Sequence, residues 1–578
     1  MTQKRKNTIT RIVFSLFVPL LFNCSGIKNK VNTPIEKDDR YPILFNMVHH
    51  NPGEPRFITQ YTQPAYIKEK GYNGQVPKFE IQCTLTYDQW QENVVPLKSE
   101  ERQWIERHAA RVDLMINNAA KNDVPVYPFT DVLVLPKSIM AKYGDELKVD
   151  GKISIQKPRT QELLKVQIAE MFNRFPKIDG LTIRFGETYL HDTPFHEGSR
   201  PVYSPEDHIK ILQLFREEVC VKRNKKLIYR TWDWGTNHWQ KLHINPEVYL
   251  KVTDAVAPHD NLYFSIKHVM GDFLRDLPFN KTLGIGQHQQ IVEVSINQAG
   301  MYGRNAHPYY IGQGVIDGWP EMEEKKGLRD LYDAPQVKGI WTWTWGDGWF
   351  GPYFGNEFWT NLNEYIIRNH TLYPKKSEEA LFNEYASNVL NMSEDNVAKL
   401  RQLCLLSVDA VFKGQATTLQ KMQPWWIRDH FFSAQDMSVY VKNGVAEQVL
   451  QEKKENLNTW YQMEQIANSI SLPNKEDEEF LRVSTTYGRI KYELIELIFR
   501  TQIMFAQMDE GKAFDREEAA LILKRYDQKW EEWYQLKKTH PCCPTLYVDY
   551  AADHCQRNEP FNVSVEKLQS LLKNQAPS

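Results

Sequence analysis

Between residues 41 and 370 the chain alternates short apolar runs with longer segments of helical periodicity. The apolar runs have the length of β-strands and occur eight times, at 41–48, 74–76, 124–129, 181–185, 227–232, 262–267, 291–296 and 339–344. Helical spacing is clear at 100–121, 160–175 and 205–221, and it is faintest between 267 and 291. Strands separated by helices form parallel sheets, so this α/β pattern predicts a (β/α)8 barrel of the TIM type.

Capping residues mark three helix starts in this region. Ser99 precedes two glutamates, Ser204 precedes Pro205, and Asn245 precedes Pro246. A side-chain acceptor followed by proline or by acidic residues is how helices commonly begin. We therefore expect helices to start directly after these three residues.

Beyond residue 372 the strand-like runs stop and helical spacing takes over, for example at 445–466 and 494–508. This change predicts two parts, a barrel domain of residues 41–372 and a C-terminal all-helical domain of residues 373–578. A helical domain of this kind commonly braces a barrel or forms a dimer contact. A homodimer through this domain is therefore an expectation.

The N-terminal segment has the layout of an export signal. Four basic residues within 4–11 precede the apolar run 12–22, which is too short to span a bilayer. Residues 21–24, Leu-Phe-Asn-Cys, resemble the bacterial lipobox, in which Cys24 becomes the lipid-modified first residue. We expect a signal peptide at 1–23, a polar tether at 24–40 and lipid anchoring on the periplasmic side or the cell surface. The alternative is an ordinary secretory signal.

Composition argues against several other classes of function. The net charge of −2 gives no overall field that would attract nucleic acid. No glycine-rich phosphate loop follows a strand, and no ligand pattern for a metal is present, so neither a cofactor nor a metal is expected. The cysteines at 542, 543 and 555 fit no standard zinc spacing; a disulfide between Cys555 and one of the other two is the alternative.

Polar and aromatic side chains gather where the predicted strands end. They are Asp131 after the third strand, Glu187 after the fourth, Asp233 after the fifth, Lys267 and Asp272 at and after the end of the sixth, Glu293 in the seventh, and Trp345 and Asp347 after the eighth. Barrel enzymes keep their active sites on this face. Hydrolysis of a glycosidic bond needs an acid for the leaving oxygen and a second carboxylate. We interpret Glu187 as the proton donor; its alternative role is a helix-cap or ion-pair contact.

The second carboxylate determines the stereochemistry. Asp272 would act as the base of an inverting enzyme, whereas Glu293 would be the nucleophile of a retaining one. The first mechanism needs carboxyl groups roughly 6.5–9.5 Å apart and the second roughly 5–5.5 Å. Sequence order alone leaves both open.

From Glu187 to the eighth strand, this order of residues resembles the family 67 α-glucuronidases, inverting exo-enzymes that remove 4-O-methylglucuronic acid from xylan side chains. The resemblance implies that Glu187 is the general acid and that Arg230, in the segment Tyr-Arg-Thr-Trp, binds the uronate. It further implies that Lys267 binds the sugar carboxylate and that Asp272 is a base. The spacing of Lys267, Asp272, Arg275 and Pro278 carries most of the likeness.

The chain departs from that family in two places. The strand-seven motif Glu-Phe-Gln-Ile-Thr-Gln-Glu is matched by residues 293–299, Glu-Val-Ser-Ile-Asn-Gln-Ala, so the family's second base falls on Ala299. Alanine cannot accept a proton, which implies a substitute base or a different substrate or stereochemistry. The family's N-terminal β-sandwich-like domain also has no counterpart before the first strand.

The prediction is a lipid-anchored, exo-acting glycoside hydrolase that removes a uronic acid or a related sugar from polysaccharide fragments. Arginine and lysine can hold a sugar carboxylate; ion pairs with strand-end acids are their alternative role. The residues expected to bind substrate are Arg230, Lys267, Trp232, Asp233, His49, Trp345 and Asp347. Two further alternatives are a retaining glycosidase that uses Glu187 with Glu293, and an inactive surface glycan-binding lipoprotein.

Overall fold

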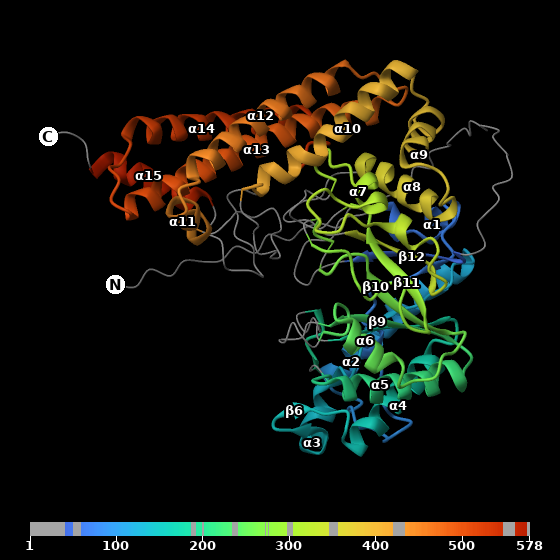
Figure 1. The fold of residues 1–578 in the computed structure, drawn as a ribbon. Coiled ribbons are helices and arrows are strands. Elements are labelled where there is room, and N and C mark those ends of the chain that lie inside the picture. Colours follow the sequence, from blue (N-terminus) through green and yellow to red (C-terminus); the bar gives the residue numbers. More distant parts are fainter. Residues whose placement is uncertain are drawn as a thin grey trace, which may run out of the picture. The chain divides into compact units, whose positions relative to one another are not determined.

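A computed structural model describes residues 41–49, 59–185, 192–198, 201–233, 241–271, 273–275, 277–297, 305–345, 356–419, 434–546 and 561–574. Its central element is an eight-stranded sheet in which every pairing is parallel (Figure 1). The strands are β1 (Ile43–His49), β2 (Gly74–Gln75), β3 (Phe129–Asp131), β7 (Gly180–Phe185), β9 (Lys226–Asp233), β10 (Leu262–Lys267), β11 (Gln289–Ser295) and β12 (Val337–Trp345). Their order in the sheet is β2-β1-β12-β11-β10-β9-β7-β3.

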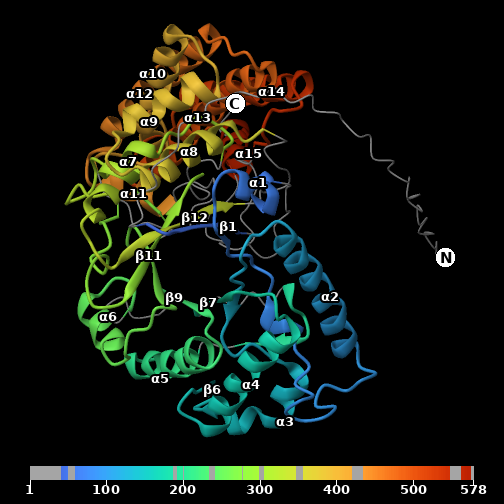
Figure 2. The same cartoon turned by 90° about the vertical axis from the view of Figure 1, so that its right-hand side faces the viewer.

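The two edges of this sheet meet. Gln75 in β2 donates its backbone N–H to the Pro125 carbonyl, and Tyr127 donates its own to the Gln75 carbonyl, both at 2.9 Å. A further bond of 2.9 Å joins the Phe129 N–H to the Pro77 carbonyl. The sheet therefore curls round on itself into a barrel-like arrangement. Figure 2 shows its strands β1, β12, β11, β9 and β7 from a second direction.

All eight predicted strands are present, and only the third is displaced. Residues 124–128 were expected to belong to it, but β3 begins at Phe129. Pro125 and Pro128 have no N–H to donate to a ladder, so only an isolated bridge forms there, between Val126 and Gln75.

Helices connect most of the strands. They are α1 (Pro64–Glu69), α2 (Glu100–Lys121), α3 (Lys137–Leu147), α4 (Pro158–Arg174), α5 (Pro205–Phe215) with a π-helical extension (Arg216–Val221), α6 (Pro246–Thr253), α7 (Gly312–Asp317) and α8 (Phe358–Leu372). Short 3-10 turns lie at Gln60–Thr62, Ile81–Thr84 and Leu328–Leu331, and two small antiparallel pairs join β4 (Leu135–Pro136) with β8 (His196–Glu197) and β5 (Lys148–Val149) with β6 (Lys152–Ile153). Among the described residues between β10 and β11 there is no helix, where the sequence pattern was faintest.

The predicted caps are confirmed. Ser99 accepts a hydrogen bond from the Arg102 N–H at 3.1 Å, and Ser204 accepts one from the Asp207 N–H at 3.2 Å. Asn245 caps α6 in the same way. Each cap satisfies a backbone donor that the first helical turn leaves without a partner.

After α8 the described chain is helical. Its elements are α9 (Glu378–Glu384) with a π-turn (Tyr385–Val389), α10 (Glu394–Gln415), α11 (Ala434–Lys442), α12 (Ala446–Ser469), α13 (Lys475–Asp509), α14 (Arg516–Thr539) and α15 (Phe561–Asn574). The long helix α13 is the centre of this region and packs against α11, α12 and α14. None of the described helices is long and apolar enough to cross a membrane. Cys542 and Cys543 are free thiols in the part of the chain that the structure describes, and Cys555 lies outside it.

Part of the space inside the curled sheet is filled by apolar side chains. Alternate residues of several strands point inward and form one buried cluster. It includes Phe45 of β1, Ile228 of β9, Tyr263 of β10, Ile291 of β11 and Trp341 of β12. The intervening residues face the helices and belong to the larger core. Because polar side chains replace apolar ones toward the carboxyl ends of the strands, the candidate site lies at that end.

Candidate active site

The inward-pointing positions near the strand ends carry charge instead of apolar side chains. They are Asp131 in β3, Arg184 in β7, Arg230 in β9, Lys267 in β10 and Glu293 in β11, and each is buried. Parallel strands end on the same edge of a sheet, so these residues line one mouth. We call this group the mouth cluster.

Arg230 and Glu293 form the central pair of the mouth cluster. The Arg230 Nε lies 2.9 Å from Glu293 Oε1 and 3.1 Å from Oε2, and Ser265 Oγ donates to Oε1 at 2.5 Å. The two charged side chains are 1% and 0% exposed. Burying charges is costly unless they are paired, and this pairing compensates much of that cost.

The Arg230 guanidinium is nevertheless not fully satisfied. Its Nη1 is buried and finds no hydrogen-bond acceptor in the part of the chain that the structure describes. The guanidinium also lies 4.9 Å from the ring centroid of Trp343 and 5.4 Å from that of Phe129. A buried cationic donor without an acceptor is a ready position for an oxygen atom of a ligand.

A second arginine–carboxylate pair lies beside the first. Arg184 donates to Asp131 through both Nε and Nη2, in the bidentate geometry that arginine and carboxylate favour. Its guanidinium is 4.9 Å from the Phe129 ring, the same ring that Arg230 contacts. Sequence reasoning noted Asp131 but gave Arg184 no role. The sequence does hold a signal for Arg184. It is the last residue but one of its strand, and Arg230 likewise lies near the end of a strand.

Lys267 and Trp232 contact each other directly. The Lys267 Nζ lies 3.3 Å from the centroid of the Trp232 ring and 5.2 Å from that of Phe273. Trp232 is buried and also contacts the His243 ring, at 4.7 Å between centroids. Two predicted substrate-binding residues are therefore brought together at the mouth, with the lysine charge against the tryptophan face.

His49 lies at the mouth, at the carboxyl end of β1. It is the last residue of that strand, it is buried, and its ring centroid lies 5.2 Å from that of Trp343. Trp343 in turn stacks on Trp341 at 5.4 Å. These rings form an aromatic wall next to Arg230.

The segment after β2 adds another cation with a buried side chain, which sequence reasoning did not identify. The Lys78 Nζ lies 3.5 Å from Glu80 Oε1, and Glu80 has a left-handed backbone with φ of +46°. Burial lowers the pKa of Lys78, while the neighbouring Glu80 carboxylate opposes that shift. The mouth therefore holds four buried cationic side chains, Lys78, Arg184, Arg230 and Lys267, among the described residues that line it.

Several predicted site residues lie outside the described residues. These are Glu187, Asp272, Asp347 and Cys24, and Ala299 is among them too. For Asp233 and Trp345 only the backbone is described, at the ends of β9 and β12. Asp233 pairs in register with Phe185, which lies two residues before Glu187 in the chain.

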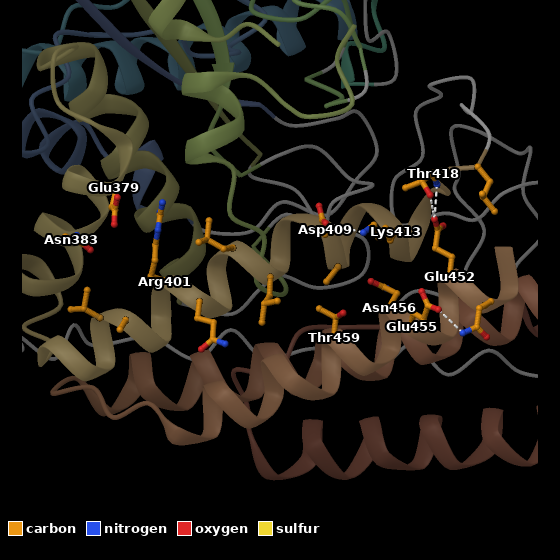
Figure 3. A pocket seen from close by; sticks show the side chains of 18 of the residues that line it. Glu379, Asn383, Arg401, Asp409, Lys413, Thr418, Glu452, Glu455, Asn456 and Thr459 are labelled. Carbon is orange, nitrogen blue, oxygen red and sulfur yellow. Dashed lines mark hydrogen bonds and ion pairs between the residues drawn. The ribbon is translucent and has the colours of Figure 1, made fainter. Parts of the chain in front are cut away.

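No group of three or more histidine, cysteine, aspartate or glutamate side chains suited to a metal ion occurs among the described residues. A large cavity is lined by residues of the helical region. It measures about 1470 Å³ and is lined by side chains of α9, α10 and α12 (Figure 3). Its charged lining is mostly acidic and partly self-paired, for example Lys413 with Asp409 at 3.2 Å.

The sequence has no significant match to a protein family profile or to a curated protein. Among solved structures, an enzyme of glycoside hydrolase family GH138 that targets pectin rhamnogalacturonan II superimposes with a TM-score of 0.52, 11% identity, and coverage of 93% of this chain and 68% of that one. The described chain has a glycoside hydrolase-like fold.

Two more distant structures are a variant of the O-GlcNAc hydrolase of Thermobaculum terrenum and the protein CpGH84B. The first has a TM-score of 0.39 and 10% identity, and covers 93% of this chain and 95% of that one. The second has a TM-score of 0.35 and 11% identity, and covers 92% and 77%. Scores this low do not establish a shared fold.

Proposed function

We propose that this protein is an exo-acting glycoside hydrolase that removes a uronic acid, or a closely related anionic sugar, from polysaccharide fragments. We interpret the curled sheet as a (β/α)8 barrel whose mouth holds the reaction. The shared fold with a GH138 enzyme that targets a pectin polysaccharide supports the general class. The resemblance of the strand ends to α-glucuronidases supports the anionic sugar.

One observation carries the choice of an anionic substrate: the buried Nη1 of Arg230, for which the described chain offers no acceptor. A sugar carboxylate would supply an oxygen there. Because Glu293 already pairs with Arg230, Lys267 at the same mouth would contribute to balancing the charge of the ligand. A neutral sugar hydroxyl could accept one hydrogen bond but would bring no negative charge to a mouth where the described residues place four buried cations and three buried carboxylates, those of Glu80, Asp131 and Glu293.

In this proposal Glu187 donates the proton to the leaving oxygen and Asp272 activates water, with inversion at the anomeric carbon. The cations of the mouth would keep Asp272 ionised as a base, whereas a more apolar setting would keep Glu187 protonated. Glu293 fits better as the residue that orients Arg230. A nucleophile must present a lone pair to the anomeric carbon, and both Glu293 oxygens already accept hydrogen bonds in a position with no exposure.

The test is incubation of the purified protein with aldouronic oligosaccharides and, in parallel, with neutral oligosaccharides of the same backbone. We expect release of the uronic acid only from the first set, and proton NMR should show the first-formed anomer to be inverted. Retention would instead favour Glu293 as nucleophile and would contradict the proposed role of Asp272 as a base.

Glu187→Gln is the matched variant. It keeps the size of the side chain but removes the proton, so turnover should fall at least about 1000-fold while binding is kept. Turnover equal to the wild type would remove Glu187 from the mechanism. If the wild-type protein is stabilised thermally by the oligosaccharides but releases no sugar, it is a glycan-binding protein and the hydrolase proposal is wrong.

We further propose, on the N-terminal pattern, that the enzyme is exported and anchored through a lipid on Cys24. Metabolic labelling with a fatty acid should mark the wild-type protein and leave Cys24→Ser unlabelled. A homodimer through the helical region is a separate proposal, and sedimentation of the protein without its first 23 residues would test it.

A further inference from the structure

The inner face of β11 ends on a serine. Every second residue of this strand points inward, in the order Ile291, Glu293 and Ser295, and Ile291 belongs to the apolar cluster inside the sheet. The intervening Val292 and Val294 belong to the larger core on the side of the helices. Ser295 therefore lies on the same face as Glu293 and one step nearer the mouth.

The Ser295 hydroxyl is buried without a partner. The residue is 0% exposed, and its Oγ has no hydrogen-bond partner in the part of the chain that the structure describes. Ser265 on the neighbouring strand β10 is equally buried, but its Oγ donates to Glu293. A buried hydroxyl without a partner destabilises the fold, and such groups are few in native proteins, so this one requires an explanation.

Ser295 and Arg230 adjoin the same tryptophan. Ser295 pairs in register with Trp343 of β12, and the Ile296 N–H beside it donates to the Trp343 carbonyl at 3.0 Å. The Arg230 guanidinium lies 4.9 Å from the Trp343 ring centroid. Arg230 also reaches β11 directly, because its Nε bonds both oxygens of Glu293, two residues before Ser295. The two orphaned groups, Ser295 Oγ and Arg230 Nη1, therefore belong to adjoining residues, and the described chain offers a partner to neither.

The chemistry of these groups indicates the ligand atoms that would suit both. Arg230 Nη1 can only donate, whereas a serine hydroxyl can donate or accept. Lys267 of β10, which pairs in register with Glu293, adds a positive charge at the same mouth. A carboxylate has two oxygens that both accept hydrogen bonds, so it can accept from a guanidinium and a hydroxyl at once. A neutral sugar hydroxyl presents a single oxygen and no charge.

We propose that Ser295 is a specificity-determining residue of the mouth: its hydroxyl donates to one oxygen of the sugar carboxylate while Arg230 Nη1 donates to the other. We call these two residues the carboxylate subsite. The inference rests on the proposed function for the class of substrate. It concerns binding, however, so it can be measured whether or not the protein cleaves a glycosidic bond.

Thermal stability gives a first test that needs no ligand. Ser295→Ala removes only a hydroxyl that bonds to nothing in the described chain, so this variant should melt at the wild-type temperature or above it. Ser407→Ala is the control. The equally buried Ser407 accepts from the Tyr310 N–H at 3.0 Å and donates to the Cys404 carbonyl at 2.6 Å, so its loss should lower the melting temperature.

Binding of free sugars gives the second test. Isothermal titration calorimetry of the full-length protein would compare glucuronate and galacturonate with glucuronamide, in which an uncharged amide replaces the carboxylate. The wild type should bind at least one uronate and bind it more tightly than the amide. Ser295→Ala should raise the Kd of that uronate about 10- to 100-fold, the effect of losing a hydrogen bond to a charged group. Ser407→Ala should retain the wild-type Kd.

Hydrolysis of aldouronic oligosaccharides gives a third measurement. The carboxylate is bound in the ground state and in the transition state alike, so Ser295→Ala should raise KM by a similar factor with little change in kcat. A residue that acts only through the stability of the fold would not produce this separation of KM from kcat.

Three results would overturn the inference: an unchanged Kd of the uronate in Ser295→Ala, a wild-type protein that binds neither uronate, or a fall in the melting temperature of Ser295→Ala as large as that of Ser407→Ala. If the wild type hydrolyses uronic substrates and Ser295→Ala keeps its KM, the proposed function stands and the subsite is wrong. If the wild type releases no sugar but binds a uronate through Ser295, the hydrolase proposal fails and the subsite stands.

Discussion

At the scale of single residues, the Arg230–Glu293 pair leads to a stability prediction. Glu293→Gln removes the carboxylate charge that compensates a guanidinium with 1% exposure. Leaving one buried charge without its partner costs about 3–5 kcal/mol of unfolding free energy. Chemical denaturation monitored by tryptophan fluorescence would measure this loss.

The double variant Arg230→Met, Glu293→Met is the informative comparison. It removes both charges, so its stability should be well above that of Glu293→Gln. Glu206→Gln is the control, because Glu206 pairs with Lys251 on the surface, where both side chains are more than half exposed; no measurable change is expected there. If the double variant were less stable than the single one, the pair would not be compensating charge.

The mouth cluster shows what single-residue reasoning can and cannot reach. Arg230 and Lys267 were singled out because cations at strand ends suit an anionic sugar, and both lie at the mouth. Arg184 and Lys78 were missed, because their importance depends on which residues of other strands they meet. The pairing of Arg184 with Asp131 joins residues that are 53 apart in the sequence, and nothing in the sequence measures that distance.

At the scale of elements, two helices of the C-terminal region meet at a glycine. A Cβ on Gly488 of α13 would lie 2.3 Å from Trp460 Cζ3 of α12 and 3.0 Å from His307 Cβ. Gly488→Ala should therefore destabilise the protein by about 1–3 kcal/mol or more, because neither ring can withdraw from a packed core.

Gly144→Ala in α3 is the matched control. Its nearest neighbour would be the flexible Lys148 Nζ at 3.6 Å, an ordinary contact. Alanine is the better helix former, so this variant should be neutral or slightly more stable. Equal melting temperatures for the two variants would contradict the close approach at Gly488.

The elements themselves were largely predictable, because their signals are local. Ser99 and Ser204 cap the expected helices, and the apolar runs form the expected strands. The third strand was placed too early because two prolines outweigh β propensity in its first half. The antiparallel bridge between Val269 and Phe279, after β10, is not predicted from the sequence, because neither residue belongs to one of the strand-like runs.

At the scale of the whole molecule, the curled sheet and the helical region share buried contacts. Trp359 of α8 donates from Nε1 to Ser484 Oγ of α13 at 3.0 Å, and His307 packs edge-on against Trp460 of α12. Together with the hydrogen bond from Arg275 to the Val408 carbonyl of α10, these contacts join the two parts at several places. We therefore expect one cooperative thermal transition; two separate calorimetric transitions would contradict this expectation.

That transition should depend on pH because several histidines are buried in the neutral form. Burial lowers the pKa of His196 to about 3 and that of His268 and His370 to about 4, from an ordinary value of 6.5. Between pH 6.5 and 4 the unfolded chain binds protons at these sites and the folded chain does not. Stability is therefore complete above about pH 6.5 and falls as the pH drops toward 4, each histidine contributing up to about 3–5 kcal/mol.

His196→Phe isolates one of these contributions. The His196 ring is buried beside Trp104, at 5.5 Å between centroids, and neither ring nitrogen has a hydrogen-bond partner among the described residues, so an apolar ring should fit the site. The melting temperature of this variant should fall less steeply between pH 7 and 4.5 than that of the wild type. If the melting temperatures of His196→Phe and the wild type fell equally steeply with pH, His196 would not be held neutral by burial. In that case the unfolded state would bind no more protons at this site than the folded state does.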